Sequence, residues 1–352
     1  MTSRLPALLG IDSPIVLGAF GGLSSVELTA AVSNAGGLGS YGLYGYDADR
    51  ITRTAAELRA RTDRPIALNL WMPTGDEVSP DDVDWEAATT ALAPLFEQVG
   101  LEVPERPARF LPDVDEQLEA VIAARPAVLS VVFGVPDRQT MERLHEAGIV
   151  VVGTATTPAE AVFLERAGVD AVVATGPEAG GHRVSFLAPA EESLIGTIAL
   201  VPAVTDAVSV PVIAAGGIAD RRGVAAAFAL GAEGVQIGTA FLRAAESAAP
   251  ASHRAALAGV AESGTVLTRA MSGRLARGVR NVAVSAIETG ESIAPFPAQN
   301  WLTGRFRSRA AELDRGELLS LWAGQGAALL ASSSPAPSAA DVFAELAAGL
   351  PH

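Results

Sequence analysis

Short apolar runs without polar alternation recur along the chain, and turn residues such as glycine and proline bound them. Such runs are typical of strands that are buried on both faces, as in a parallel sheet. Several of them directly follow an Ala-Gly or Gly-Ala pair, which is a common helix end. The pattern therefore predicts alternating strands and helices, with strands near residues 14–17, 38–41, 65–71, 128–133, 149–152, 170–175, 210–215 and 234–237.

A series of about eight parallel strands with right-handed crossovers most often closes into a barrel. We therefore predict an α/β protein with a TIM (β/α)8 barrel, an insertion after strand 3 and a C-terminal helical extension. A doubly wound open sheet is the alternative fold. The insertion, residues 72–111, is acidic and contains prolines, and it is a candidate lid over the site.

The predicted domains follow from this division of the chain. The barrel takes residues 1–260, including the insertion at 72–111. Residues 261–331 form an extension that packs on the barrel and contributes to the substrate pocket. Residues 332–352 form a linker and a terminal helix. Within the two additions we expect helices near residues 85–96 and 302–330.

The net charge and the lack of cysteine exclude several classes of partner and of catalytic chemistry. The net charge of −15 argues against nucleic acid and against anionic membrane surfaces as partners. The absence of cysteine excludes disulfides, thiolate nucleophiles, cysteine-bound zinc and iron–sulfur clusters, so redox chemistry would need a bound organic cofactor. No secretory signal and no membrane-length apolar run is apparent, so we expect a cytoplasmic protein, and a homodimer is compatible with the sequence.

One loop, residues 176–183, concentrates the candidate chemistry. Gly180 and Gly181 let the backbone approach a ligand closely, and His182 follows them directly. The alternative is a turn with an incidental histidine. Glu178 and His182 have a spacing that could bind a metal on a helix, but the two glycines disfavour a helix, and we expect no metal site. The other histidines, His145, His253 and His352, are expected to be solvated and without function.

Two further glycine patterns are rejected as nucleotide motifs. Residues 37–42 match the G-x-G-x-x-G fingerprint, but a helix precedes them and the glycines flank a strand, which is the reverse of the required order. Residues 176–182 have the glycine spacing of a P-loop but lack its lysine and hydroxyl residue.

A pair of glycine-rich turns is the strongest signal. Gly216 and Gly217 follow the seventh predicted strand, and residues 236–239 end the eighth. Barrels commonly hold a phosphate group at this place with backbone amides and the start of a short helix. The alternative is that these glycines serve the turns alone.

With these residues read, the chain resembles the nitronate monooxygenase family, formerly called 2-nitropropane dioxygenases, which are FMN-containing barrels. The resemblance covers about residues 10–330, and its motifs are residues 14–22, Asn69, 178–183, 214–218, 234–239, 272–277 and 322–325. It implies that the FMN phosphate lies on Gly217 and residues 236–239, and that His182 is the catalytic base. The implied cofactor-binding residues are Ala19, Phe20, Gly21, Asn69, Thr175, Gly180, Gly181, Gly216, Gly217, Gln236, Ile237, Gly238 and Thr239.

Three positions depart from the family pattern. Many members have glutamine in place of Thr175, a Pro-Met pair in place of Ala19 and Phe20, and glycine in place of Val184. Flavin contacts should survive these changes, whereas the shape of the substrate pocket should differ.

The resemblance implies an FMN-dependent nitronate monooxygenase, which uses O2 to convert alkyl nitronates or nitroalkanes into carbonyl compounds and nitrite. Arg183, Arg277 and Arg280 are candidate partners for the nitronate oxygens, and structural salt bridges are the other role open to them. The alternative enzyme is an NAD(P)H-dependent FMN reductase acting on a quinone or an enoyl thioester. A flavin-binding barrel without turnover is the third hypothesis.

Overall fold

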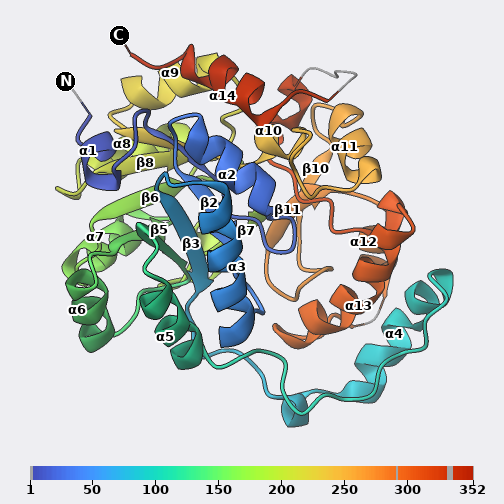
Figure 1. Cartoon of the computed structure of the whole chain (residues 1–352). Coiled ribbons are helices and arrows are strands. Elements are labelled where there is room, and N and C mark those ends of the chain that lie inside the picture. Colours follow the sequence, from blue (N-terminus) through green and yellow to red (C-terminus); the bar gives the residue numbers. More distant parts are fainter. Residues whose placement is uncertain (1–2, 291, 331–335, 352) are drawn as a thin grey trace.

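The computed structural model describes residues 3–290, 292–330 and 336–351, and its main feature is an eight-stranded parallel sheet (Figure 1). The strand order is β1-β9-β8-β6-β5-β4-β3-β2, and bonds between Leu17 and Leu38 and between Leu38 and Ile15 join β1 to the chain just before β2. The predicted TIM barrel is confirmed. Its strands are β1 (Ile15–Leu17), β2 (Gly39–Gly42), β3 (Ile66–Trp71), β4 (Val128–Val132), β5 (Val150–Ala155), β6 (Ala171–Thr175), β8 (Val212–Ala215) and β9 (Gly234–Ile237).

Helices cover the outside of the barrel, and polar caps fix where they begin. The hydroxyl of Ser25 accepts from the Leu28 amide, so Ser25 caps the first outer helix. Asp220 caps another of these helices by accepting from the amides of Arg222 and Gly223. The outer helices are α2 (Val26–Asn34), α3 (Ala48–Arg61), α5 (Val114–Ala124), α6 (Arg138–Glu146), α7 (Pro158–Arg166), α8 (Thr197–Thr205) and α9 (Arg221–Ala229).

The last helix, α14 (Ala339–Ala347), returns to the barrel. It packs against α2 and α9, with Phe343 and Leu346 buried (Figure 1). An apolar face at helical spacing explains this docking, because it must be buried against another element. The start of the predicted linker, residues 332–335, lies outside the described residues.

The two additions to the barrel pack on each other. We call residues 72–111 together with 265–322 the lobe. The insertion helix α4 (Trp85–Gln98) confirms the helix predicted near 85–96, and it packs against α12 (Val282–Thr289) and α13 (Ala298–Glu312). The rings of Phe96 and Phe306, 5.6 Å apart, lie in the core of the lobe. Of the helices predicted near 302–330, α13 is the α-helix and two 3-10 turns follow it, because Asp314 turns the chain in a left-handed conformation (φ 51°).

The remaining elements close the amino end of the barrel and connect the lobe to it. Leu5 and Leu9 of the N-terminal helix α1 pack on the apolar interior of the barrel. Short elements complete the chain: α1 (Leu5–Leu9), α10 (Thr239–Leu242), α11 (Ala251–Ala258), β7 (Gly181–His182), β10 (Thr265–Thr268), β11 (Ala276–Val279) and the 3-10 turns η1 (Pro80–Asp82), η2 (Ala190–Glu192), η3 (Gly316–Leu318) and η4 (Gln325–Leu329). Within the described ranges, no helix has the length and hydropathy that a bilayer crossing requires.

Candidate active site

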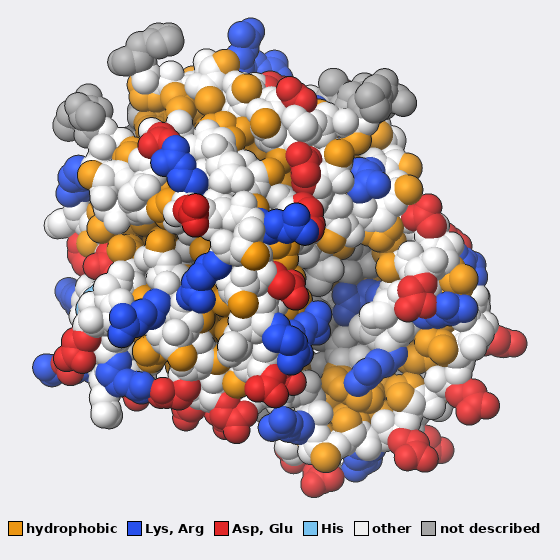
Figure 2. Space-filling model, in the orientation of Figure 1, with side chains coloured by type: hydrophobic (Ala, Val, Ile, Leu, Met, Phe, Trp, Pro, Cys, Tyr) orange, Lys and Arg blue, Asp and Glu red, His pale blue; other side chains and the backbone are white. Residues whose placement is uncertain are grey.

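A cavity of about 1000 Å³ lies at the carboxyl ends of the strands, between the barrel and the lobe. Figure 2 shows the molecule hollowed between these two parts, with cationic side chains around the hollow. The insertion contributes Leu101 and Arg109 to the wall, and the extension contributes Asn300 and Trp322. Every cofactor-binding residue predicted from the sequence lines this cavity, except Ile237, which is buried in the core between the sheet and its helices.

The two glycine-rich turns are neighbours in the structure. Strands β8 and β9 pair in parallel, with Ala215 opposite Gln236, so the turns that follow them lie at the same edge of the barrel. Gly216 (φ 107°) and Gly217 (φ 71°) have a backbone conformation that side chains with a Cβ rarely adopt. In the described part of the chain, the amides of Gly217, Gly238 and Thr239 donate to no protein acceptor. Unpaired amides on a cavity wall can bind a phosphate group.

Hydrogen bonds fix the loop that carries the histidine to these turns. The carboxylate of Glu178 accepts from the Thr197 amide (2.9 Å) and hydroxyl (2.7 Å). The Thr197 hydroxyl also lies 3.2 Å from the carbonyl of Gly216. Glu178 therefore has a structural role. Among the residues that the structure describes, no group of three histidine or acidic side chains is placed to hold a metal ion.

A second part of the wall is built from β1, β3 and β6. Asn69 donates to the hydroxyl (2.9 Å) and the carbonyl (3.2 Å) of Ser130, which fixes the orientation of its amide.

Gly180, in the loop before His182, lies against the extension, since a Cβ there would be 2.7 Å from the backbone of Ala323 and Gly324. The extension thus closes directly on the histidine loop, and only glycine fits at that position.

His182 lies in β7, which pairs with β11 of the extension, opposite Ala276. Its Nε2 is 2.8 Å from the Ser272 hydroxyl, and that hydroxyl donates its single proton to the carbonyl of Arg274 (3.0 Å). Because the Arg274 carbonyl takes the Ser272 proton in this arrangement, the geometry favours the tautomer with the hydrogen on Nε2, in which Nδ1 can accept a proton.

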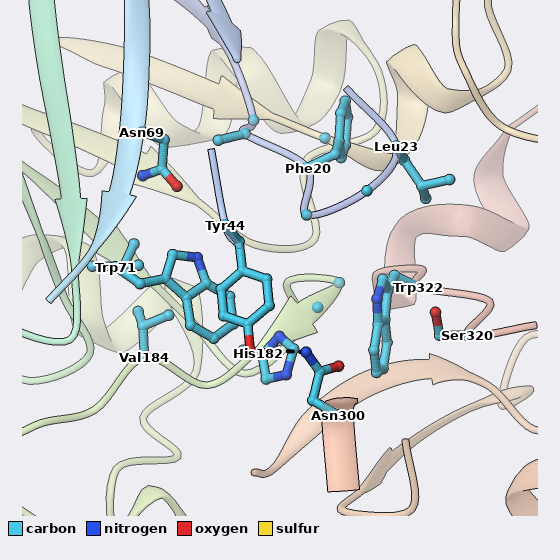
Figure 3. A pocket seen from close by; sticks show the side chains of 18 of the residues that line it. Phe20, Leu23, Tyr44, Asn69, Trp71, His182, Val184, Asn300, Ser320 and Trp322 are labelled. Carbon is cyan, nitrogen blue, oxygen red and sulfur yellow. Dashed lines mark hydrogen bonds between the residues drawn. The ribbon is translucent and has the colours of Figure 1, made fainter. Parts of the chain in front are cut away.

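Two indole rings and two cations surround the imidazole. The ring centroids of Trp71 and Trp322 lie 4.8 Å and 5.3 Å from that of His182 (Figure 3). Burial, followed by the positive charges of Arg274 and Arg307, lowers the pKa of His182 to about 3. The imidazole is therefore neutral at physiological pH.

The three arginines considered as substrate partners do not line the cavity, so that hypothesis is wrong. Arg183 is buried and donates to the carbonyls of Thr175, Gly176 and Ser193. The Arg277 guanidinium donates to the carbonyl of Pro177 at 2.6 Å, and Arg280 pairs with Glu288. Their role in the structure is to fix backbone segments and α12.

The predicted exposure of the other histidines is partly wrong. His145 is exposed and lies 3.1 Å from Asp170, whereas His253 is 1% exposed and lines the cavity. His253 Nε2 lies 3.1 Å from the carbonyl of Trp322, so it donates there, and its buried Nδ1 has no partner. His352 lies outside the described residues.

Sequence reasoning missed several residues of the wall. Tyr44, Asn300 and Arg307 line the cavity, although no motif marks them. Tyr44 lies just beyond strand β2. Asn300 and Arg307 lie seven positions apart on α13, a helix with a weakly marked apolar face. A tyrosine after a barrel strand was the one available signal, because catalytic residues of barrels lie at those positions.

Comparisons with known proteins find relatives over nearly the whole chain. The family model described as nitronate monooxygenase matches residues 2–349. A probable nitronate monooxygenase of Staphylococcus aureus strain JH9 is 39% identical over 341 residues, which are 95% of this chain and 94% of that protein. The structure of nitroalkane oxidase from Streptomyces ansochromogenes is 36% identical, with a TM-score of 0.86, over 99% of this chain and 97% of that one. FabK from Thermotoga maritima is 30% identical, with a TM-score of 0.75, over 98% and 95%.

Proposed function

The chain belongs to the nitronate monooxygenase family and is an oxidoreductase, and from this premise we propose the finer assignment. The enzyme is FMN-dependent and uses O2 to convert alkyl nitronates and nitroalkanes to carbonyl compounds and nitrite. The observation that carries the proposal is the location of His182 in the same cavity as the two glycine-rich turns. The similarity to a nitroalkane oxidase structure supports the substrate class.

The residues present fit the cofactor. The unpaired amides of Gly217, Gly238 and Thr239 suit a phosphate group, and they balance its charge without a lysine or arginine. Ala19, Phe20, Gly21, Asn69, Thr175, Gly180 and Gly181 line the rest of the wall and would surround the isoalloxazine, with Gly216 and Gln236 near the phosphate. A bound FMN would supply the electron acceptance that no protein side chain here provides.

The protein's own contribution is to hold and orient the substrate and to accept its proton. His182 Nδ1 accepts the α-proton of a nitroalkane, while Ser272 holds Nε2 and so keeps the ring in the required tautomer. A nitronate needs no proton removal, so this substrate does not require His182 as a base. Trp71 and Trp322 exclude water from both sides of the ring.

Two measurements test the assignment. The purified protein should show the two visible absorption bands of a flavin, and it should release nitrite and consume O2 when a nitronate is added. The His182→Asn variant should keep the flavin bands, keep most of its activity on a nitronate and lose activity on the neutral nitroalkane. Unchanged turnover of the nitroalkane by this variant would show that His182 is not the base.

The NAD(P)H-dependent reductase is the second candidate, because the cavity is large enough for a second organic ligand. Rapid anaerobic mixing separates the two. Bleaching of the flavin by NADH favours a reductase, and bleaching by a nitronate favours the monooxygenase.

A further inference from the structure

Arg307 is a cation on the cavity wall for which the described residues provide no carboxylate partner. Its Nη1 donates to the Ser320 hydroxyl (2.8 Å), and its Nη2 donates to the side chain (2.8 Å) and carbonyl (3.2 Å) of Asn300. Its Nε is buried and has no partner. Burial lowers the pKa of Arg307 to about 10, so the guanidinium is still charged at neutral pH.

This situation differs from that of Arg274, the other cation near His182. Arg274 packs between the rings of Phe133 and Phe296 and pairs with Asp76 and Glu77 of the insertion. Its charge is therefore balanced by the protein. A partly buried cation without a counter-ion is costly, so the uncompensated charge of Arg307 suits a site that an anion completes.

Asn300 connects Arg307 to Tyr44. Because its Oδ1 accepts from Arg307, its Nδ2 must be the atom that faces Tyr44, and it donates to the phenol oxygen at 2.9 Å. The phenol proton is then left for another acceptor. Burial raises the pKa of Tyr44 to about 12, so this proton is present at neutral pH.

Tyr44 and His182 share one wall. The rings of both pack on Trp71, with centroids 4.4 Å and 4.8 Å from it, and Figure 3 shows the Tyr44 hydroxyl and the Asn300 amide meeting beside the imidazole. Phe296 packs on Tyr44 from another direction, at 6.2 Å. The phenol is thus fixed in apolar surroundings, where a hydrogen bond to a charged group is strong.

We propose that Tyr44, Asn300 and Arg307 form the subsite for the anionic nitronate group, with the Tyr44 hydroxyl donating to a nitronate oxygen next to His182. This inference rests on the proposed function and names the residues that bind its substrate. Tyr44 touches the substrate. Asn300 orients the phenol, and Arg307 acts through Asn300 and supplies the balancing positive charge.

The test uses the full-length holoenzyme and two sets of variants, each with a matched control. Tyr44→Phe is compared with Tyr46→Phe, whose hydroxyl contacts Tyr41 and does not line the cavity. Arg307→Met and Arg307→Lys are compared with Arg309→Met, an exposed arginine on the same helix that pairs with Glu312. The measurements are kcat and KM for a nitronate and for its parent nitroalkane, and the Kd of inorganic nitrite by calorimetry.

Loss of a hydrogen bond to a charged group should raise the nitronate KM and the nitrite Kd of Tyr44→Phe about 10- to 100-fold. KM for the neutral nitroalkane should change less, and the flavin absorbance should stay at the wild-type level. Arg307→Met should act in the same direction, Arg307→Lys should recover part of the loss, and the two control variants should stay within about twofold of wild type.

The inference is overturned if Tyr44→Phe binds nitrite and nitronate within about twofold of wild type, or if the wild type binds no nitrite. Tyr44→Phe removes one oxygen from a cavity wall, so it decides the question even if Arg307→Met does not fold. A wild type that binds nitrite but does not oxidise nitronates contradicts the proposed function alone, and the nitrite Kd of Tyr44→Phe still decides the subsite.

Discussion

Lowering the pH from 8 to 5 should leave His182 able to accept a proton, although an ordinary histidine would be protonated over this interval. A lowered pKa means that the neutral base is present above that pKa and is lost only as the pH falls through it. With a pKa of about 3, roughly 1% of His182 is protonated at pH 5. With the ordinary pKa of about 6.5, roughly 97% would be protonated, and kcat/KM for a neutral nitroalkane would fall about 30-fold.

The assay is the initial rate of nitrite release from a neutral nitroalkane, added from a fresh stock at each pH, with the flavin absorbance checked at both ends of the range. His182→Asn is measured in parallel, because any acid limb that remains in this variant has another origin. We expect the wild-type profile to lack a limb near pH 6.5. A wild-type limb near pH 6.5 that disappears in His182→Asn would refute the reasoning, since it would show an imidazole with an ordinary pKa.

Three further predictions concern stability and positioning. His253 has a pKa lowered to about 4 by burial, so the unfolded chain binds a proton first, and the contribution of His253 to stability should fall by about 1.6 kcal/mol between pH 6.5 and 5. The His253→Gln variant should lose that much less in urea titrations at the two pH values, and parallel slopes would contradict this. Gly217→Ala should lower both stability and flavin occupancy. The control is Gly148→Ala, because Gly148 has a similar φ of 75° and open space around it, and this variant should lose only stability, by about 1–2 kcal/mol. Equal flavin occupancy in the two variants would argue against the phosphate site. Ser272→Ala should lower kcat on the nitroalkane about 3- to 10-fold by freeing His182 Nε2, with unchanged kcat speaking against the assigned tautomer.

The barrel and the glycine-rich turns were predictable because their signals are local. Each strand is a short apolar run, and the order of a parallel barrel places the turns after β8 and β9 side by side once the strands are known. His182 could be predicted as a site residue because it follows the glycines of its own loop. Confirming that it faces the same cavity as the turns required the structure.

The residues that complete the cavity were not predictable, because their contacts join distant parts of the chain. Asn300 contacts Tyr44 although more than 250 positions of sequence separate them, and the sequence around neither residue indicates this contact. For the same reason, the sequence did not indicate which arginine lines the cavity. Arg183 adjoins His182 in sequence but is buried against backbone carbonyls, whereas Arg307 reaches the cavity from a helix of the extension.

The return of α14 to the barrel affects how the protein is made. Residues 238–338 separate the last barrel strand from the helix that packs between α2 and α9, and at about 5–20 residues per second a ribosome needs roughly 5–20 s to translate them. During that time the nascent barrel leaves the surface that Phe343 will cover open to solvent. A chaperone that binds apolar surface would protect the nascent chain in this interval.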